Sequence, residues 1–132
     1  MGKNLIQQAR GKGSPTYKAP SFRYKGKAKH RSITKKASEG KVIDLIHCPG
    51  HSAPLAGVKF DDTLTLTIAP ENMKVGQTVQ ANTTVIETGN VVCLQDIPEG
   101  TFIYNIESQP GDGGKFVRAS GGAAKIITKT AK

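Results

Sequence analysis

The residues of this chain that are best suited to chemistry are cations interleaved with aromatic rings near its N-terminus. Positions 1–41 hold 12 Lys or Arg residues and a single acid, Glu39, so this segment carries a formal charge of +11, while the whole chain carries +9. Its cations can neutralise phosphates, and its rings can stack on unpaired bases. The combination indicates contact with nucleic acid; the alternative is that the rings dock on the chain's own domain. The interleaved residues are Tyr17, Lys18, Phe22, Arg23, Tyr24 and Lys25.

The charge balance reverses in the middle of the chain and becomes basic again at its end. Residues 42–107 hold two bases and eight acids, and residues 108–132 hold five bases and one acid. A polyanion offsets the self-repulsion of clustered positive charge, so this asymmetry also favours a nucleic-acid partner. The candidate nucleic-acid contacts are Lys3, Arg10, Lys12, Tyr17, Lys18, Phe22, Arg23, Tyr24, Lys25, Lys29, His30, Arg31, Lys35, Lys36, His47, His51, Lys115, Arg118 and Lys125.

Residues 47–51 combine two histidines with Cys48, which are residue types that also bind metals. A closed zinc site needs four ligands, and only Cys93 and scattered carboxylates remain to complete one. We therefore predict a polar turn rather than a metal site. If His47 and His51 lie beside phosphate, their protonated forms would strengthen binding as the pH falls.

The chain lacks the residue arrangements that catalysis needs. Asp61 and Asp62 lie between two alternating runs, where adjacent aspartates usually form a turn rather than a catalytic pair. A nucleophile made of Cys48 and His47 would lack an orienting group and oxyanion donors at readable spacing. We therefore predict a protein that is not an enzyme and needs no cofactor or metal.

A glycine-rich run at residues 111–114 does not have the spacing of a nucleotide-binding loop and does not open a helix. Its glycines would instead let the backbone pass close to phosphates, with Lys115 and Arg118 beside them. We predict a second nucleic-acid contact at this place.

The first 41 residues are predicted to form an extended peptide. Gly11, Gly13, Pro15, Pro20 and Gly26 prevent a long helix, and few aliphatic side chains are present to offset the cost of ordering. Trypsin should therefore cut this segment and leave a resistant fragment that begins near residue 41.

Five short strands are predicted at residues 42–46, 54–60, 63–68, 75–79 and 101–106. Alternating side chains of the third and fifth strands should bury a common core. Short strands without a long amphipathic helix favour an all-β fold, specifically a five-stranded OB-like barrel, an architecture that often binds nucleic acid. The residues expected to share the core are Leu64, Leu66, Ile68, Phe102, Tyr104 and Ile106.

Targeting features and a disulfide are not expected. The chain has no apolar run of about 18 residues and no apolar leader at residues 1–6, and Ile6 breaks the myristoylation pattern. Secretion, membrane insertion and lipid anchoring are therefore not predicted. Cys48 and Cys93 are expected to be buried free thiols.

Short motifs follow one another along most of the chain. Each is weak alone, but their order from residue 1 to about residue 122 makes the set specific. The motifs are Gln7-Gln8, Arg10-Gly11-Lys12-Gly13-Ser14-Pro15-Thr16-Tyr17, Ala19-Pro20-Ser21, Ala53-Pro54-Leu55-Ala56, Ile68-Ala69-Pro70-Glu71, Val75-Gly76-Gln77, Ile97-Pro98-Glu99-Gly100-Thr101 and Pro110-Gly111-Asp112-Gly113-Gly114-Lys115-Phe116-Val117-Arg118-Ala119-Ser120-Gly121. Together they resemble the universal large-subunit ribosomal protein L-two family in its archaeal and eukaryotic form.

The resemblance implies a fold, a partner and a location. It implies an OB-like RNA-binding barrel at 42–107, an extended arm at 1–41 that threads into ribosomal RNA, and a Gly-rich basic linker with the first strand of a second, SH3-like barrel at 108–132. It further implies a cytoplasmic, ribosomal protein that fastens RNA segments near the peptidyl-transferase region. Other ribosomal proteins are further expected partners.

Two departures from the family pattern stand out. Cys48 and His51 stand where the family usually has Asp and Arg, so a carboxylate and a permanent cation are lost. Only the first strand of the SH3-like barrel is present, and its open edge at residues 123–129 would allow self-association with a second copy. The remaining alternatives are a free-standing OB-type module that binds single-stranded RNA or DNA, and a protein-interaction barrel with a disordered basic tail.

Overall fold

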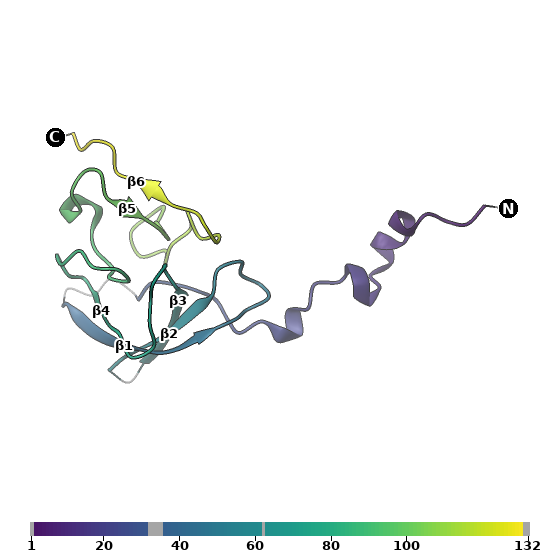
Figure 1. Cartoon of the computed structure of the whole chain (residues 1–132), viewed down its shortest axis with the longest axis horizontal. Coiled ribbons are helices and arrows are strands. Elements are labelled where there is room, and N and C mark those ends of the chain that lie inside the picture. Colours follow the sequence, from purple (N-terminus) through teal and green to yellow (C-terminus); the bar gives the residue numbers. More distant parts are fainter. Residues whose placement is uncertain (1, 32–35, 62, 131–132) are drawn as a thin grey trace.

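Four antiparallel strands form the main sheet of the computed structural model, which describes residues 2–31, 36–61 and 63–130 (Figure 1). The strand order is β3-β2-β1-β4, and a second, two-stranded sheet pairs β5 with β6. The described elements are strands and short 3₁₀ helices, which confirms the predicted all-β class. The strands are β1 (Ser38–Ile46), β2 (Leu55–Phe60), β3 (Thr63–Ile68), β4 (Thr78–Ala81), β5 (Phe102–Ile103) and β6 (Ala124–Lys125).

The central hairpin of the main sheet joins β2 to β3 in the register that the sequence alternation implies. Leu55 pairs with Ile68 at one end, and Phe60 pairs with Thr63 at the other. Asp61 has a φ of 47°, and the Thr63 hydroxyl donates to the Phe60 carbonyl at 3.1 Å, so the predicted aspartate turn is confirmed at Asp61. Asp62 lies outside the described residues.

The core is divided into two clusters because β2 is covered on both faces. Ala56, Val58 and Phe60 pack with residues of β1 and β4 in a first cluster, together with Met73. Leu55 packs with Ile68, Ala53, Cys48 and the distant Ala28 in a second cluster. The second cluster therefore ties the N-terminal segment to the sheet. One close approach in β1 needs glycine, because a Cβ at Gly40 would lie 2.6 Å from the Phe60 ring.

The predicted core face of the third and fifth strands is only partly correct. Ile68 is buried and Leu66 packs against the second cluster, but Leu64 is 64% exposed. Tyr104 also packs against that cluster, whereas Phe102 is 70% exposed. Strand β3 is an outer strand of its sheet, so alternation places its leucines on one face without ensuring that this face is covered.

The largest differences from the predicted strand boundaries lie in the first, fourth and fifth strands. Strand β1 begins at Ser38 rather than residue 42, and β4 begins at Thr78 because Gly76, with a φ of 88°, lies in the preceding turn. The fifth strand is reduced to Phe102–Ile103, which pairs with β6 and not with the main sheet. The sheets are those of an OB-like fold in their order of elements, and closure of a barrel is not seen among the described strand pairs.

The N-terminal arm, residues 2–27, extends away from the sheets (Figure 1). It contains no long helix, as predicted, but it is not simply extended. Three 3₁₀ helices interrupt it, at Ile6–Lys12, Pro15–Tyr17 and Ser21–Arg23. Pro15 opens the second of these, where its fixed φ suits the first helical position.

The two cysteines are both free but differ in burial. Cys48 is a buried free thiol, while Cys93 is free and exposed, so the prediction of a buried Cys93 is wrong. Within the described residues, no helix has the length and apolar character needed to cross a bilayer.

Two leucines that the sequence does not distinguish should differ in their effect on stability. Leu55 is fully buried, so Leu55→Ala should lower the free energy of unfolding by about 2–5 kcal/mol. Leu64→Ala, at a largely exposed position, should change it by no more than about 0.5 kcal/mol. Urea unfolding of both variants measures the difference, and equal losses would contradict the two-cluster core.

Candidate nucleic-acid interface

The base of the arm is fastened to the domain through its backbone. The Lys29 amide donates to the Leu66 carbonyl of β3 at 2.8 Å, and the His30 amide donates to the Gly113 carbonyl at 3.0 Å. The Arg118 guanidinium donates to the Ala28 carbonyl at 2.7 Å, and Ala28 is only 2% exposed. These contacts define the anchor, residues 28–31, which fixes where the arm leaves the domain.

Side chains of the anchor are also engaged by the domain. The His30 Nε2 atom forms a hydrogen bond with the Asn105 carbonyl. The Arg31 guanidinium lies over the Phe60 ring, 5.0 Å from its centroid, and reaches Asp61 at 3.4 Å. Such cation–π and ion-pair contacts orient a side chain even where they stabilise the fold only modestly. His30 and Arg31, together with Arg118, therefore hold the arm in place.

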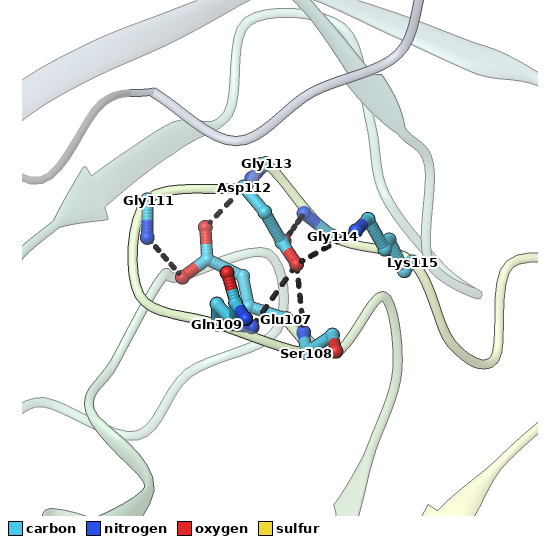
Figure 2. Close-up of polar contacts among 8 residues, drawn as sticks. All are labelled: Glu107, Ser108, Gln109, Gly111, Asp112, Gly113, Gly114 and Lys115. Atoms are coloured by element: carbon cyan, nitrogen blue, oxygen red, sulfur yellow. Dashed lines mark hydrogen bonds and ion pairs between the residues drawn. The ribbon is translucent and has the colours of Figure 1, made fainter.

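The glycine-rich loop at residues 107–115 is organised by its own two carboxylates (Figure 2). Glu107 accepts hydrogen bonds from the amides of Gly111 at 3.0 Å and Gly113 at 2.9 Å. Asp112 accepts at 3.0 Å from the amides of Ser108, Gln109 and Gly114, and Lys115 lies 3.7 Å from it. The loop amides that could have met phosphate are thus already bonded to carboxylates.

Asp112 is held in its ionised form by this geometry. Burial opposes ionisation, but the amides of Gly114, Gln109 and Ser108 outweigh it with help from Lys115, so the pKa of Asp112 lies below its ordinary value. The carboxylate thereby stabilises a loop whose Gly113 carbonyl receives the anchor.

Gly114 shows why the loop needs glycine where it meets the domain. Its φ is 95°, and an added Cβ would collide with Asn105, which is 1% exposed. The loop packs directly on Asn105, and Asn105 in turn holds His30. The loop, Asn105 and the anchor form one connected unit.

The turn at residues 47–51 contacts the arm just before the anchor. Cys48 lies between the Lys25 amide and the His51 ring, while His47 points to solvent as an exposed residue. The described residues contain no group of three or more His, Cys, Asp or Glu that could hold a metal ion.

The remaining predicted contacts lie on the surface. Phe22 is 83% exposed beside Arg23, whose guanidinium is 5.3 Å from its centroid, and Arg10 lies 5.7 Å from the centroid of the half-buried Tyr17. Lys125 lies over Phe102 at 5.7 Å. Lys35 lies outside the described residues. The exposed predicted contacts are Lys3, Arg10, Lys12, Lys18, Phe22, Arg23, Tyr24, Lys25, Lys29, Lys36, His47, Lys115 and Lys125.

Sequence reasoning missed residues of two kinds. Lys27 is exposed between two predicted cations, and the continuous run of charge could have signalled it. Asn105 and Glu107 organise the anchor and the loop, but no local pattern marks them, since their partners include residues as much as 75 positions away.

Two family models and the curated relatives all point to the same group of proteins. The family model for Ribosomal Proteins L2, RNA binding N-terminal domain, matches residues 3–81, and the model for the C-terminal domain of the same proteins matches residues 87–132. The chain is 50% identical over 134 residues to the large ribosomal subunit protein uL2 of Methanosphaera stadtmanae, covering 97% of this chain and 56% of that protein. With uL2 of Methanothermobacter thermautotrophicus the identity is 48% over 137 residues, covering 99% and 57%. The chain thus spans about half the length of the curated relatives it matches.

Asp112→Asn should weaken the fold more than Asp61→Asn, because an amide cannot accept three backbone hydrogen bonds and Asp61 is largely exposed. A carboxylate whose pKa is lowered by folding stabilises the fold at pH values above its pKa in the unfolded chain, about 3.8. This contribution is lost as the pH falls through the lower pKa of the folded state. Denaturant unfolding from pH 7 down to pH 2 should show this acid-dependent component in the parent and in Asp61→Asn, but not in Asp112→Asn. Identical profiles for the two variants would contradict it.

Arg118→Met should expose the anchor to protease while keeping the side-chain bulk. Loss of a charged donor to the Ala28 carbonyl should raise trypsin cleavage after Lys29 about tenfold, relative to cleavage after Lys12 in the same digest. Lys74→Met, which removes an exposed cation far from the anchor in sequence, is the matched control and should leave the ratio unchanged. A ratio unaffected by Arg118→Met would show that this contact does not hold the arm.

Proposed function

Because the chain belongs to the L2 family of ribosomal proteins, we propose that it binds ribosomal RNA as a structural, non-catalytic constituent of the large ribosomal subunit. Its place is the cytoplasmic ribosome, where it fastens RNA segments near the peptidyl-transferase region beside other ribosomal proteins. The observation that carries this proposal is a cationic arm that projects from the domain and that, among the described residues, is hydrogen-bonded to it only from Lys25 onward (Figure 1).

The arm offers its charge to a polyanion rather than to its own domain. In the part of the chain that the structure describes, no cation between Lys3 and Lys29 takes part in an ion pair, although the middle of the chain is acidic. Phosphate contacts by Lys and Arg supply most of the affinity of such proteins and release counterions from the RNA. The exposed Phe22 ring adds a surface on which a base can stack.

The candidate residues divide into two proposed roles. The exposed cations of the arm, with Lys36, His47, Lys115 and Lys125, contact phosphate, while Tyr17, Phe22 and Tyr24 meet bases or sugars. His30, Arg31, His51 and Arg118 have protein partners and position the contacts of their neighbours. In this scheme residues 1–41, which include the arm and the anchor, are the RNA-binding segment, and residues 42–107 are the OB-like body. Residues 108–132 are a Gly-rich basic linker with the first strand of an SH3-like barrel.

A free-standing module for single-stranded nucleic acid is the second candidate. It is favoured by one observation, the exposure of two rings outside the arm, Phe102 at 70% and Phe116 at 55%. Base stacking on these rings is worth about 1–3 kcal/mol per base. The double variant Phe102→Leu, Phe116→Leu separates the candidates, because it should weaken binding of a single-stranded oligonucleotide by the module but leave binding of large-subunit ribosomal RNA through the arm intact.

Two matched double variants test the role of the arm in RNA binding. Lys12→Gln with Lys18→Gln, and Lys59→Gln with Lys74→Gln, remove the same charge from exposed positions in the arm and in the body. The first pair should flatten the dependence of log affinity on log salt by about 1.4–1.8, because each phosphate contact contributes about 0.7–0.9 to this slope. The second pair should change the slope little.

Titration of large-subunit ribosomal RNA fragments between 50 and 200 mM salt measures these slopes. Equal flattening by the two pairs would show that the arm has no special part in binding. An affinity that does not depend on salt would contradict the proposed function itself.

A further inference from the structure

A fully buried thiol lies where the arm first meets the domain. Cys48 Sγ is 3.5 Å from the backbone nitrogen of Lys25 and 3.4 Å from Nδ1 of His51. Along the described chain, Lys25 is the first arm residue whose backbone bonds to the domain. The sulfur is thus placed between a residue of the arm and a titratable ring of the body.

The turn around this sulfur is shaped to receive two successive arm residues. The His51 amide donates to the Cys48 carbonyl at 3.0 Å and closes the turn. The Tyr24 ring lies against Gly50, where an added Cβ would come within 3.3 Å of it. The contacts of Tyr24 and Lys25 are therefore made to one short turn, ahead of the anchor at residues 28–31.

The protonation of the sulfur decides how strongly it holds the arm. A thiol donates its proton to Nδ1 of His51 and is a weak acceptor for the Lys25 amide. A thiolate accepts from both the Lys25 amide and an Nδ1–H of the His51 ring, and hydrogen bonds to a charged acceptor are shorter and roughly twice as strong. The arm contact is accordingly stronger in the ionised form.

The surroundings favour that ionised form near neutral pH. The Lys25 amide and then His51 lower the pKa of Cys48 to about 7, against the opposing effect of burial, with a further contribution from the Gly50 amide. Tyr104, packed on the same cluster, stays neutral in this range because burial raises its pKa to about 12. Of the other charged groups on neighbouring elements, Arg118 is half-buried and donates to the Ala28 carbonyl. The remaining side chains are exposed, namely those of Lys25, Lys27, Lys29 and His47.

We propose that Cys48 and His51 form a proton-controlled clasp that holds the arm at Lys25 when the sulfur is ionised and loosens it when the sulfur is protonated. An acid whose pKa is lowered by folding stabilises the folded state fully at pH values above its ordinary pKa, here 9.0. This contribution is lost as the pH falls through the folded-state pKa of about 7. The clasp therefore tightens as the pH rises from 7. It concerns only this chain and does not depend on RNA binding.

Limited trypsin digestion of the full chain between pH 6 and pH 9 tests the clasp. The measured quantity is cleavage after Lys25 relative to cleavage after Lys12 in the same digest, so that the pH dependence of trypsin itself cancels. In the parent this ratio should fall as the pH rises through 7, by at most about 100-fold, since the lowering from 9.0 to about 7 corresponds to that factor. Cys93→Ser, which changes the other and exposed cysteine, should behave as the parent.

Three further variants examine the chemistry of the sulfur. Cys48→Ser keeps a similar shape with a hydroxyl that does not ionise, so its cleavage ratio should stay high and independent of pH. Cys48→Asp supplies a permanent carboxylate, so its ratio should stay low and also independent of pH. In His51→Gln the pH at which the ratio falls should move upward, because the sulfur loses a partner that favours its charge.

Two results would overturn the proposal. One is a parent ratio that does not change between pH 6 and pH 9. The other is a pH dependence that persists in Cys48→Ser, which would place the titrating group elsewhere. Lys25 amide hydrogen exchange, corrected for its intrinsic rate, gives the same comparison in any variant whose core is shown to be intact by unchanged protection of the Val58 amide.

Discussion

The insertion of residues 28–31 between β3 and the loop at residues 107–115 is the constraint on which the rest of the structure depends. Backbone bonds to Leu66 and Gly113 give this short segment the role of an added strand-like element, and buried Ala28 completes the second core cluster. A segment rich in charge and poor in aliphatic side chains buries too little apolar surface to offset the entropy cost of its own ordering. Fixing it at one point allows an ordered domain and an exposed arm to coexist in one chain.

The acidic residues of the loop contribute to this constraint from within the protein. Glu107 and Asp112 use their oxygens to accept backbone amides, which fixes the loop in the shape that presents the Gly113 carbonyl to His30. A glycine-rich loop beside cations resembles a phosphate-binding loop in sequence. Its amides face carboxylates instead, so in the proposed RNA interface the loop takes part through Lys115 and through the path that it sets for the arm.

Local sequence predicted the elements better than it predicted their surroundings. The alternation at residues 63–68 predicted β3 correctly, because side-chain period depends on the backbone alone, but the exposure of Leu64 depends on what covers that face. The charge of the arm was likewise evident, while the distinction between Arg118 and Lys115 was not. Arg118 meets a carbonyl 90 positions away, and only the folded chain brings the two together.

Cations of the same type therefore have different roles according to their distance from the anchor. Near the anchor, the Arg31 guanidinium stacks over the Phe60 ring and the Arg118 guanidinium donates to the Ala28 carbonyl. These contacts fix the orientation of both side chains and partly shield their charge. Farther out, repulsion among like charges and the scarcity of apolar side chains keep the arm from collapsing onto an acidic body, even though opposite charge would attract it. Exposed surface pairs are worth only about 0–1 kcal/mol, too little to hold a long arm against the body, whereas a dense row of phosphates engages many cations at once. The arm thus remains open to a polyanion because its own domain offers it too few charges at too low a density.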